Sequence, residues 1–186
     1  PFSNLYIYSD SVFDMGNSTD DGEFMRHYAY LAEELYRVTK PGRLTAIHCK
    51  DLPMYKGRDG SAGLRDFPGE IVRMYESKGW RYHSRVTIWK CPVVEMTRTK
   101  ALGLLYKQLQ KDSTRSRQGM ADYLLVFRAP GENAVPINGK EEVSRNEWIE
   151  WAECTWDIKE TDTLNLSGTK GEGDTKHICP LQLGVI

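Results

Sequence analysis

One stretch of this sequence constrains the fold more than any other. It runs from Glu34 to Leu52 and reads E-L-Y-R-V-T-K-P-G-R-L-T-A-I-H-C-K-D-L. A helical pattern ends at Lys40, because Pro41 cannot continue the hydrogen bonding of a helix and Gly42 tolerates a tight reversal. The stretch therefore predicts a helix, a sharp turn and a new element, in that order.

The element after the turn, residues 44–49, predicts a short buried strand. Its end carries polar side chains capable of chemistry, on His48, Cys49, Lys50 and Asp51. In open α/β sheets ligands bind at the carboxyl ends of strands, so the sequence predicts an α/β protein with a site at the strand tips. His48 and Cys49 are adjacent, and adjacent side chains of a strand point to opposite faces. We expect structural roles for both rather than a nucleophile and its base.

The composition indicates one ordinary globular domain. The chain has 186 residues, of which 40% are apolar and 27% charged, with a formal net charge of -1. No apolar run approaches the ~20 residues of a membrane helix, and no signal-peptide pattern is visible. Four widely spaced cysteines without a C-x-x-C pair favour free thiols and a cytoplasmic protein with no membrane partner. The histidines have no ligand spacing, so no metal site is expected at His27, His83 or His177.

Helical and strand patterns alternate along the first two thirds of the chain. Asp20 and Glu23 resemble a capping box, and the helix they open carries an apolar face at Phe24, Tyr28, Leu31, Leu35 and Val38. A second helix is predicted after a cap at Asp66, with Pro68 in its first turn, Phe67, Ile71 and Tyr75 facing inward, and Gly79 at its end. Residues 51–66 are predicted to be a long loop, and residues 80–90 and 121–128 to be strands.

Charge is distributed unevenly along the rest of the chain. Residues 96–118 hold six basic residues and one acid, and Leu102, Leu105 and Leu109 give part of this segment a helical stripe. A solvated amphipathic helix and a surface that follows nucleic-acid phosphates both fit this pattern. Residues 132–174 are acidic, with eleven acids against four basic residues. In this acidic part Ser144 and Glu147 predict a capped short helix that carries Trp148 and Trp151.

Five segments, in chain order, resemble motifs of the DNA amino-methyltransferases. These enzymes, known from phages and bacteria and from restriction-modification, methylate the exocyclic amine of adenine or cytosine with S-adenosylmethionine. The order is that of the circular form in which the catalytic motif precedes the cofactor motif. The segments are Pro1-Phe2, like the end of an (Asp/Ser/Asn)-Pro-Pro-(Tyr/Phe/Trp) tetrapeptide, residues 35–44, residues 79–92 with Trp-Lys-x-Pro, residues 121–128, and residues 177–183.

The resemblance implies a fold and a division of the chain. The fold class is α/β, part of a doubly wound, Rossmann-like S-adenosylmethionine-dependent methyltransferase sheet with an inserted DNA-recognition region. Residues 1–129 would be the catalytic half with a basic insert at 96–118, and residues 130–176 the variable, target-recognition region. Residues 177–186 would begin the cofactor-side helix, with Pro180 in its first turn.

The resemblance also implies site residues and partners. Pro1 and Phe2 would be catalytic, with Phe2 stacked on a base rotated out of double-stranded DNA; without the resemblance, Phe2 reads as a core aromatic. S-adenosylmethionine would be the cofactor, bound in part by His177, Ile178, Pro180 and Gln182. DNA contacts would come from the basic segment, at Arg98, Lys100, Lys107, Lys111, Arg115 and Arg117. The tryptophans Trp148, Trp151 and Trp156 read as core aromatics of the variable region.

The chain also departs from the family pattern. The first two residues of the tetrapeptide and the Phe-x-Gly-x-Gly cofactor loop are absent, and both ends look cut from a longer protein. We therefore expect the isolated chain to be inactive and to need a complementary half or a homo-oligomer. The acidic balance of residues 132–174 is unexpected for a DNA-facing surface. A non-catalytic DNA-binding module derived from such an enzyme, and a methyltransferase acting on RNA or a small molecule, remain alternatives.

Overall fold

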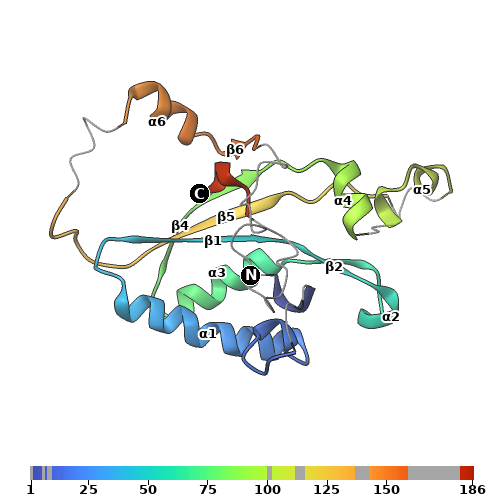
Figure 1. Ribbon diagram of the computed structural model, residues 1–186, viewed down its shortest axis with the longest axis horizontal. Helices are drawn as coiled ribbons and strands as arrows, with labels where there is room; N and C mark the ends of the chain where they lie inside the picture. Colours follow the sequence, from blue (N-terminus) through green and yellow to red (C-terminus); the bar gives the residue numbers. More distant parts are fainter. Residues whose placement is uncertain are drawn as a thin grey trace, which may run out of the picture.

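The computed structural model of the chain describes residues 2–5, 7, 10–99, 102–111, 116–136, 143–158 and 181–186. A four-stranded sheet lies at its centre, and the helices α1 and α3 pack together on one face of it (Figure 1). The strands, in sheet order, are β1 (Leu44–Lys50), β5 (Asp122–Arg128), β4 (Arg81–Ile88) and β6 (Thr155–Trp156). The three longer strands are those predicted from the sequence, and the α/β class is confirmed.

Strand directions determine which strand ends meet. Strand β5 is antiparallel to both of its neighbours, β1 and β4, whereas β6 is parallel to β4. Strands β1 and β4 therefore run in the same direction, and their carboxyl ends meet the amino end of β5. In the register, Asp122 is the partner of Lys50 on one side and of Ile88 on the other. The sequence did not predict that β5 runs against the other strands.

Helix α1 (Asp21–Val38) begins one residue after its predicted cap. The Asp20 carboxylate accepts a hydrogen bond from the Glu23 backbone N–H at 2.7 Å. The Glu23 carboxylate accepts instead from the backbone N–H and hydroxyl of Thr19, at 2.6 and 2.7 Å. The predicted capping box is therefore only half correct, because its second bond is made one residue earlier than the motif requires.

The buried face of α1 is narrower than predicted. Phe24, Tyr28 and Ala32 are buried, whereas Leu31 and Val38 are 43% and 62% exposed. The buried residues are spaced four apart, and the face that they form rotates slowly around the helix axis. Leu31 and Val38 therefore lie at the edge of this buried face. The prediction of these two residues as core was wrong.

Helix α3 (Phe67–Ser77) matches its prediction closely. The Asp66 carboxylate accepts from the Gly69 N–H at 2.8 Å, and Phe67, Ile71 and Tyr75 are buried against the sheet. The ring of Tyr75 stacks on that of Phe127 of β5, with centroids 4.5 Å apart. Such stacked aromatic contacts, together with buried apolar area, are the main stabilising contribution in a core of this kind.

The long loop predicted for residues 51–66 is in fact a small folded unit. Strands β2 (Leu52–Met54) and β3 (Gly63–Arg65) pair antiparallel, with the short helix α2 (Lys56–Asp59) between them. The guanidinium of Arg65 forms ion pairs with Asp21 of α1 and Glu70 of α3. These tertiary ion pairs attach the unit to α1 and α3. Local sequence patterns do not reveal such contacts between distant residues.

The basic segment is broken into short pieces rather than one striped helix. It consists of α4 (Pro92–Thr99), the 3-10 turn η3 (Leu102–Leu104) and α5 (Tyr106–Lys111). These pieces project from the end of the sheet opposite α6 (Figure 1). The predicted stripe of Leu102, Leu105 and Leu109 therefore does not form, because the helix is interrupted within it.

The acidic part of the chain contributes helix α6 (Arg145–Trp151) and strand β6. Ser144 and Glu147 form the complete predicted capping box. Trp148 and Trp151 are 63% and 54% exposed, so their interpretation as core aromatics was wrong, while Trp156 is half-buried. Helix α6 lies apart from the α1–α3 layer (Figure 1), and so these rings have no core to enter.

Three 3-10 turns complete the described elements: η1 (Ser3–Leu5), η2 (Met15–Asn17) and η6 (Leu183–Val185). At the C-terminal end we predicted an α-helix starting at Pro180, which lies outside the described residues. The described part of that segment, residues 181–186, holds the η6 turn and no α-helix. None of the described helices is both long and apolar enough to cross a membrane.

Candidate functional site

Four charged or ionisable side chains converge where β1, β4 and β5 meet. His48 and Lys50 come from the end of β1, Lys90 follows β4, and Asp122 is the first residue of β5. The His48 Nε2 lies 2.9 Å from Asp122 Oδ2, and the ammonium groups of Lys50 and Lys90 each lie 3.3 Å from an Asp122 oxygen. We call these four residues the strand-tip cluster. Of the polar residues predicted at the end of β1, His48 and Lys50 lie in this cluster.

Asp122 is ionised despite its burial. Its side chain is only 8% exposed, and burial by itself would raise the carboxyl pKa. The hydrogen bond from His48 and the charges of Lys50 and Lys90 outweigh burial and lower the pKa of Asp122 from 3.8 to about 2. Since a carboxylate only accepts, the Nε2 of His48 donates this hydrogen bond. Asp122 therefore fixes both the orientation and the tautomer of the imidazole.

Cys49 lies on the other side of the sheet from this cluster. It is fully buried in the core beneath α1 and α3, and burial raises the pKa of its thiol to about 12. A thiol with that pKa is not a nucleophile at neutral pH. The expectation that His48 and Cys49 do not form a catalytic pair is confirmed.

Phe2 lies against the strand-tip cluster. Its ring is 5.6 Å from the His48 ring, in an edge-to-face arrangement at 88°. Phe2 is half-buried, so it is neither a fully enclosed core residue nor a surface residue. The other residue predicted to be catalytic, Pro1, lies outside the described residues.

The six basic residues predicted to contact DNA have different environments. Lys107 and Lys111 are exposed on α5. Arg117 donates to the buried carboxylate of Glu95 at 3.0 Å, and the same carboxylate accepts from the Met120 N–H. Arg117 thus has at least a partly structural role. Arg98 is described only as part of the α4 backbone, and Lys100 and Arg115 lie outside the described residues.

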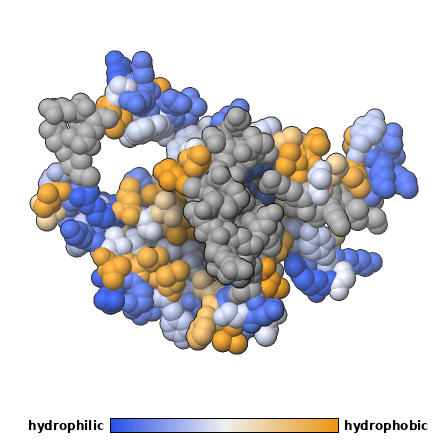
Figure 2. Space-filling model, in the orientation of Figure 1, coloured by the Kyte–Doolittle hydropathy of each residue, from blue (hydrophilic) through white to orange (hydrophobic). Residues whose placement is uncertain are grey.

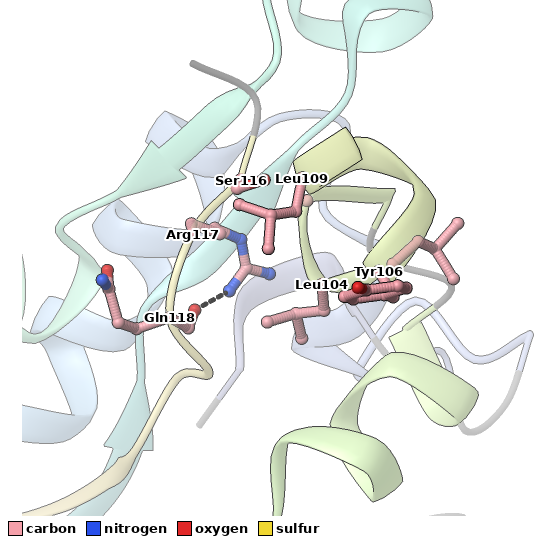
Figure 3. A pocket seen from close by; sticks show the side chains of 8 residues that line it. Leu104, Tyr106, Leu109, Ser116, Arg117 and Gln118 are labelled. Atoms are coloured by element: carbon pink, nitrogen blue, oxygen red, sulfur yellow. Dashed lines mark hydrogen bonds between the residues drawn. The ribbon is translucent and has the colours of Figure 1, made fainter. Parts of the chain in front are cut away.

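An open pocket of about 510 Å³ lies between η3, α5 and the segment that leads into β5. Its wall is formed by leucines and Tyr106, with Ser116, Arg117 and Gln118 along one side (Figure 3). Tyr106 is 73% exposed, and Arg117 donates to the Gln118 carbonyl at 2.8 Å. Hydrophobic and hydrophilic surfaces adjoin on this projecting lobe (Figure 2). An exposed aromatic ring beside lysines is suited to a flat ring with an anionic backbone.

The residues predicted to bind the cofactor are mostly undescribed. His177, Ile178 and Pro180 lie outside the described residues, whereas Gln182 is buried at 6% exposure. Its side-chain oxygen has no hydrogen-bond partner among the described residues. A buried carbonyl oxygen without a donor is costly, so the Gln182 side-chain oxygen is an unsatisfied acceptor in the described part of the chain.

A second open pocket, of about 680 Å³, lies between the end of α6 and the C-terminal turn. Trp151, Trp156 and Ile186 give it apolar walls, and its charged lining groups are all acidic: Glu150, Glu153 and Asp157. The negative charge of this surface disfavours contact with phosphates. Nowhere in the described ranges do three or more His, Cys, Asp or Glu side chains gather in a way that could hold a metal ion.

Sequence reasoning named Lys50 among the polar residues of the strand tip but missed Asp122 and Lys90. A signal was present, because Asp122 opens an otherwise apolar strand, D-Y-L-L-V-F, and each lysine stands at the end of a predicted strand. What could not be predicted was that the strand of Asp122 runs antiparallel between the other two. That arrangement brings its first residue to their last ones.

Comparison with known proteins identifies the fold. No protein-family model matches the chain, and no curated protein does. Solved structures do match, among them three crystal structures of one protein from Thermus thermophilus, described as a "Putative DNA Modification Methylase". Its complex with S-adenosyl-L-methionine superposes with a TM-score of 0.58 at 16% identity, over 74% of this chain and 51% of that one. A second structure of it gives 0.54 at 15% identity, over 84% and 57%.

The chain shares part of a Rossmann-like α/β fold with that protein. It spans about half the length of the methylase that it matches. At this level of identity the likeness concerns the fold, and function has to be argued from the site.

Proposed function

We propose that this chain is the catalytic half of a DNA amino-methyltransferase. The complete enzyme would transfer a methyl group from S-adenosylmethionine to the exocyclic amine of adenine or cytosine in double-stranded DNA. The observation that carries the proposal is the place of Phe2, the expected base-stacking residue. It lies at the carboxyl ends of the strands, against His48, in a fold shared with a methylase crystallised with S-adenosyl-L-methionine.

The chemistry requires an oriented base. The lone pair of an exocyclic amine is delocalised into the ring, so the amine is a poor nucleophile and must be held in line with the methyl group. In this proposal the ring of Phe2 stacks on the extruded base and fixes its plane. His48 supports the Phe2 ring from the side, and Asp122 holds His48. Pro1 would shape the neighbouring backbone carbonyl that accepts from the amine.

The buried Gln182 supports the expected cofactor side of the site. Its unpartnered oxygen can accept from the amino group or a ribose hydroxyl of S-adenosylmethionine, as a cofactor-binding residue would. His177, Ile178 and Pro180 would complete this side. When bound, the cofactor supplies an electrophilic methyl group on a sulfonium. The chain's own residues orient the acceptor.

DNA contact is proposed for the projecting basic lobe. Lys107 and Lys111 are exposed and free to follow phosphates, with Arg98, Lys100, Arg115 and Arg117 as further candidates. Such contacts position the enzyme without reading sequence. The acidic lining between α6 and the C-terminal turn is a poor phosphate surface. Sequence reading by residues 130–176 therefore has to use other side chains, and the exposed Trp148 and Trp151 are candidates.

The isolated chain is proposed to be inactive, because it spans about half of the methylase that it matches. A complementary half, supplied by flanking sequence or by another subunit, would complete the cofactor pocket. Isothermal titration of the purified chain with S-adenosylmethionine tests this point. Micromolar binding together with methyl transfer by the chain alone would contradict it.

The function itself is tested at Phe2 in a protein extended by the residues encoded on either side. With tritiated S-adenosylmethionine and duplex DNA, Phe2→Ala should lower methyl transfer by about 5- to 150-fold, since base stacking is worth about 1–3 kcal/mol. Phe2→Trp, the matched control, keeps a stacking ring and should retain most activity. Methylation of RNA or small molecules instead of DNA, or equal activity of the two variants, would refute the assignment.

A further inference from the structure

The strand-tip cluster has more positive than negative charge. Two ammonium groups, from Lys50 and Lys90, and the imidazole of His48 face the single carboxylate of Asp122. Among the described residues, no other carboxylate lies within 4 Å of either lysine nitrogen. With His48 neutral, the cluster therefore has a net charge of +1.

This surplus charge is largely removed from water. The side chains of Lys50 and Lys90 are 14% and 11% exposed. Burial of an ion is costly unless it is paired and hydrogen-bonded. Among the described residues, the single carboxylate of Asp122, 3.3 Å from each ammonium group, is shared by the two lysines.

We propose that Lys50 and Lys90 form a binding site for an oxyanion at the strand tips. The anion would add the negative charge and the acceptor oxygens that the cluster lacks. Asp122 holds the two ammonium groups together and limits the affinity, because its own charge repels the anion. A site of this kind binds reversibly, as a substrate group requires.

The nature of the anion rests on the proposed function. Phe2, the expected stacking residue, contacts His48 of the cluster, and a base stacked on Phe2 places its own nucleotide's backbone nearby. The anion would then be a phosphodiester of the target strand. The carboxylate of S-adenosylmethionine has the same chemistry and is the other source, which the experiment has to separate.

Inorganic phosphate tests the site without DNA or methyl donor. At equal ionic strength, ~100 mM phosphate should raise the unfolding temperature of the chain by roughly 3 °C relative to chloride, as expected for a dissociation constant near ~10 mM. Lys50→Met and Lys90→Met should each abolish most of this shift. Lys78→Met is the matched control, since Lys78 pairs with Glu33 away from the strand tips, and it should keep the shift.

A substitution at Asp122 should change the phosphate-induced stabilisation in the opposite direction. Asp122→Asn removes the repelling charge, so phosphate should stabilise this variant more than the wild-type chain, although the variant starts from lower stability. A purely structural cluster predicts lower stability for all three substitutions and the same phosphate shift in the wild-type chain and the variants, because phosphate also stabilises proteins non-specifically. The absence of a phosphate-specific shift in the wild-type chain is sufficient to overturn the proposal, even if a variant fails to fold.

Two further titrations, on the protein extended by the residues encoded on either side, identify the source of the anion. With a labelled duplex, loss of one lysine should reduce the slope of log K against log salt by about 0.9 if a phosphodiester is bound. With S-adenosylmethionine, the same variants should weaken binding about tenfold if its carboxylate is bound. No change in either titration would contradict a substrate role for the site. Because the phosphate measurement needs neither partner, its failure is distinct from a failure of the proposed methyl transfer.

Discussion

Replacing Asp122 with asparagine should change how the stability of this chain depends on acid. The pKa of Asp122 is lowered from 3.8 to about 2 in the folded chain. Since one pKa unit corresponds to about 1.4 kcal/mol, ionised Asp122 contributes about 2 kcal/mol of pH-dependent stability. The folded pKa is below the unfolded one, so this contribution is complete above pH ~4 and is lost as the pH falls towards 2.

Urea unfolding of the wild-type chain and Asp122→Asn, followed from pH 7 to pH 2, measures this contribution. At pH 7 the variant should be less stable by about 2 kcal/mol or more, because two buried ammonium groups lose their partner. The difference should shrink by about 2 kcal/mol between pH 5 and pH 2. Asp10→Asn removes an exposed carboxylate and, as the control, should change stability at pH 7 by less than about 0.5 kcal/mol.

Two results would refute this reasoning. If Asp122→Asn is as stable as the wild-type chain at pH 7, the carboxylate does not stabilise the strand tips. If the difference between the two proteins stays constant from pH 5 to pH 2, the Asp122 carboxyl does not titrate with a lowered pKa, and the lysines and His48 do not act on it.

Two further predictions concern the core. Gly79 has a φ of +94°, and an added Cβ would lie 3.1 Å from the Tyr36 ring, so Gly79→Ala should lower the free energy of unfolding by about 1–2 kcal/mol. Gly57→Ala, where a Cβ meets nothing within 4 Å, should have little effect in the same urea titration. Because burial raises the pKa of Cys49 to about 12, iodoacetamide at pH 8 should modify the exposed Cys154 and leave Cys49 intact until the chain unfolds. Mass spectrometry of the digested protein checks this, and modification of Cys49 at the rate of Cys154 would contradict its burial.

Local patterns in the sequence predicted the elements whose structure is determined locally. Helix α3 needs an acidic cap, a proline in its first turn and a glycine at its end, and all three are visible in the sequence. The capping box of α6 is equally local and was predicted correctly. Strands β1, β4 and β5 follow from runs of apolar, aromatic and β-branched residues, which are enriched in strands.

Features that depend on distant residues were not predictable in this way. The folded unit at residues 52–65 is attached through Arg65 to Asp21 and Glu70, and no periodicity encodes those contacts. Trp148 and Trp151 have the apolar character of core residues and are nevertheless exposed. Only the position of their helix relative to the core explains their exposure.

The candidate site was predicted in part. The sequence pattern predicted His48 at a strand tip, and the family resemblance implied that Phe2 lies near the site. The structure places their rings 5.6 Å apart. The charged partners Lys50, Lys90 and Asp122 come together only because β5 runs antiparallel between two parallel strands. Their assembly is a consequence of topology, which a single sequence does not specify.

The most direct test of the account is the composition of DNA from a bacterial host that lacks its own adenine and cytosine methylases. The host should express the protein extended on both sides of this chain. After digestion of its DNA to nucleosides, mass spectrometry should detect N6-methyladenine or N4-methylcytosine, and neither should appear with Phe2→Ala. DNA without either modified base, from a host that contains folded protein, would contradict the proposal that this fold carries an amino-methyltransferase site.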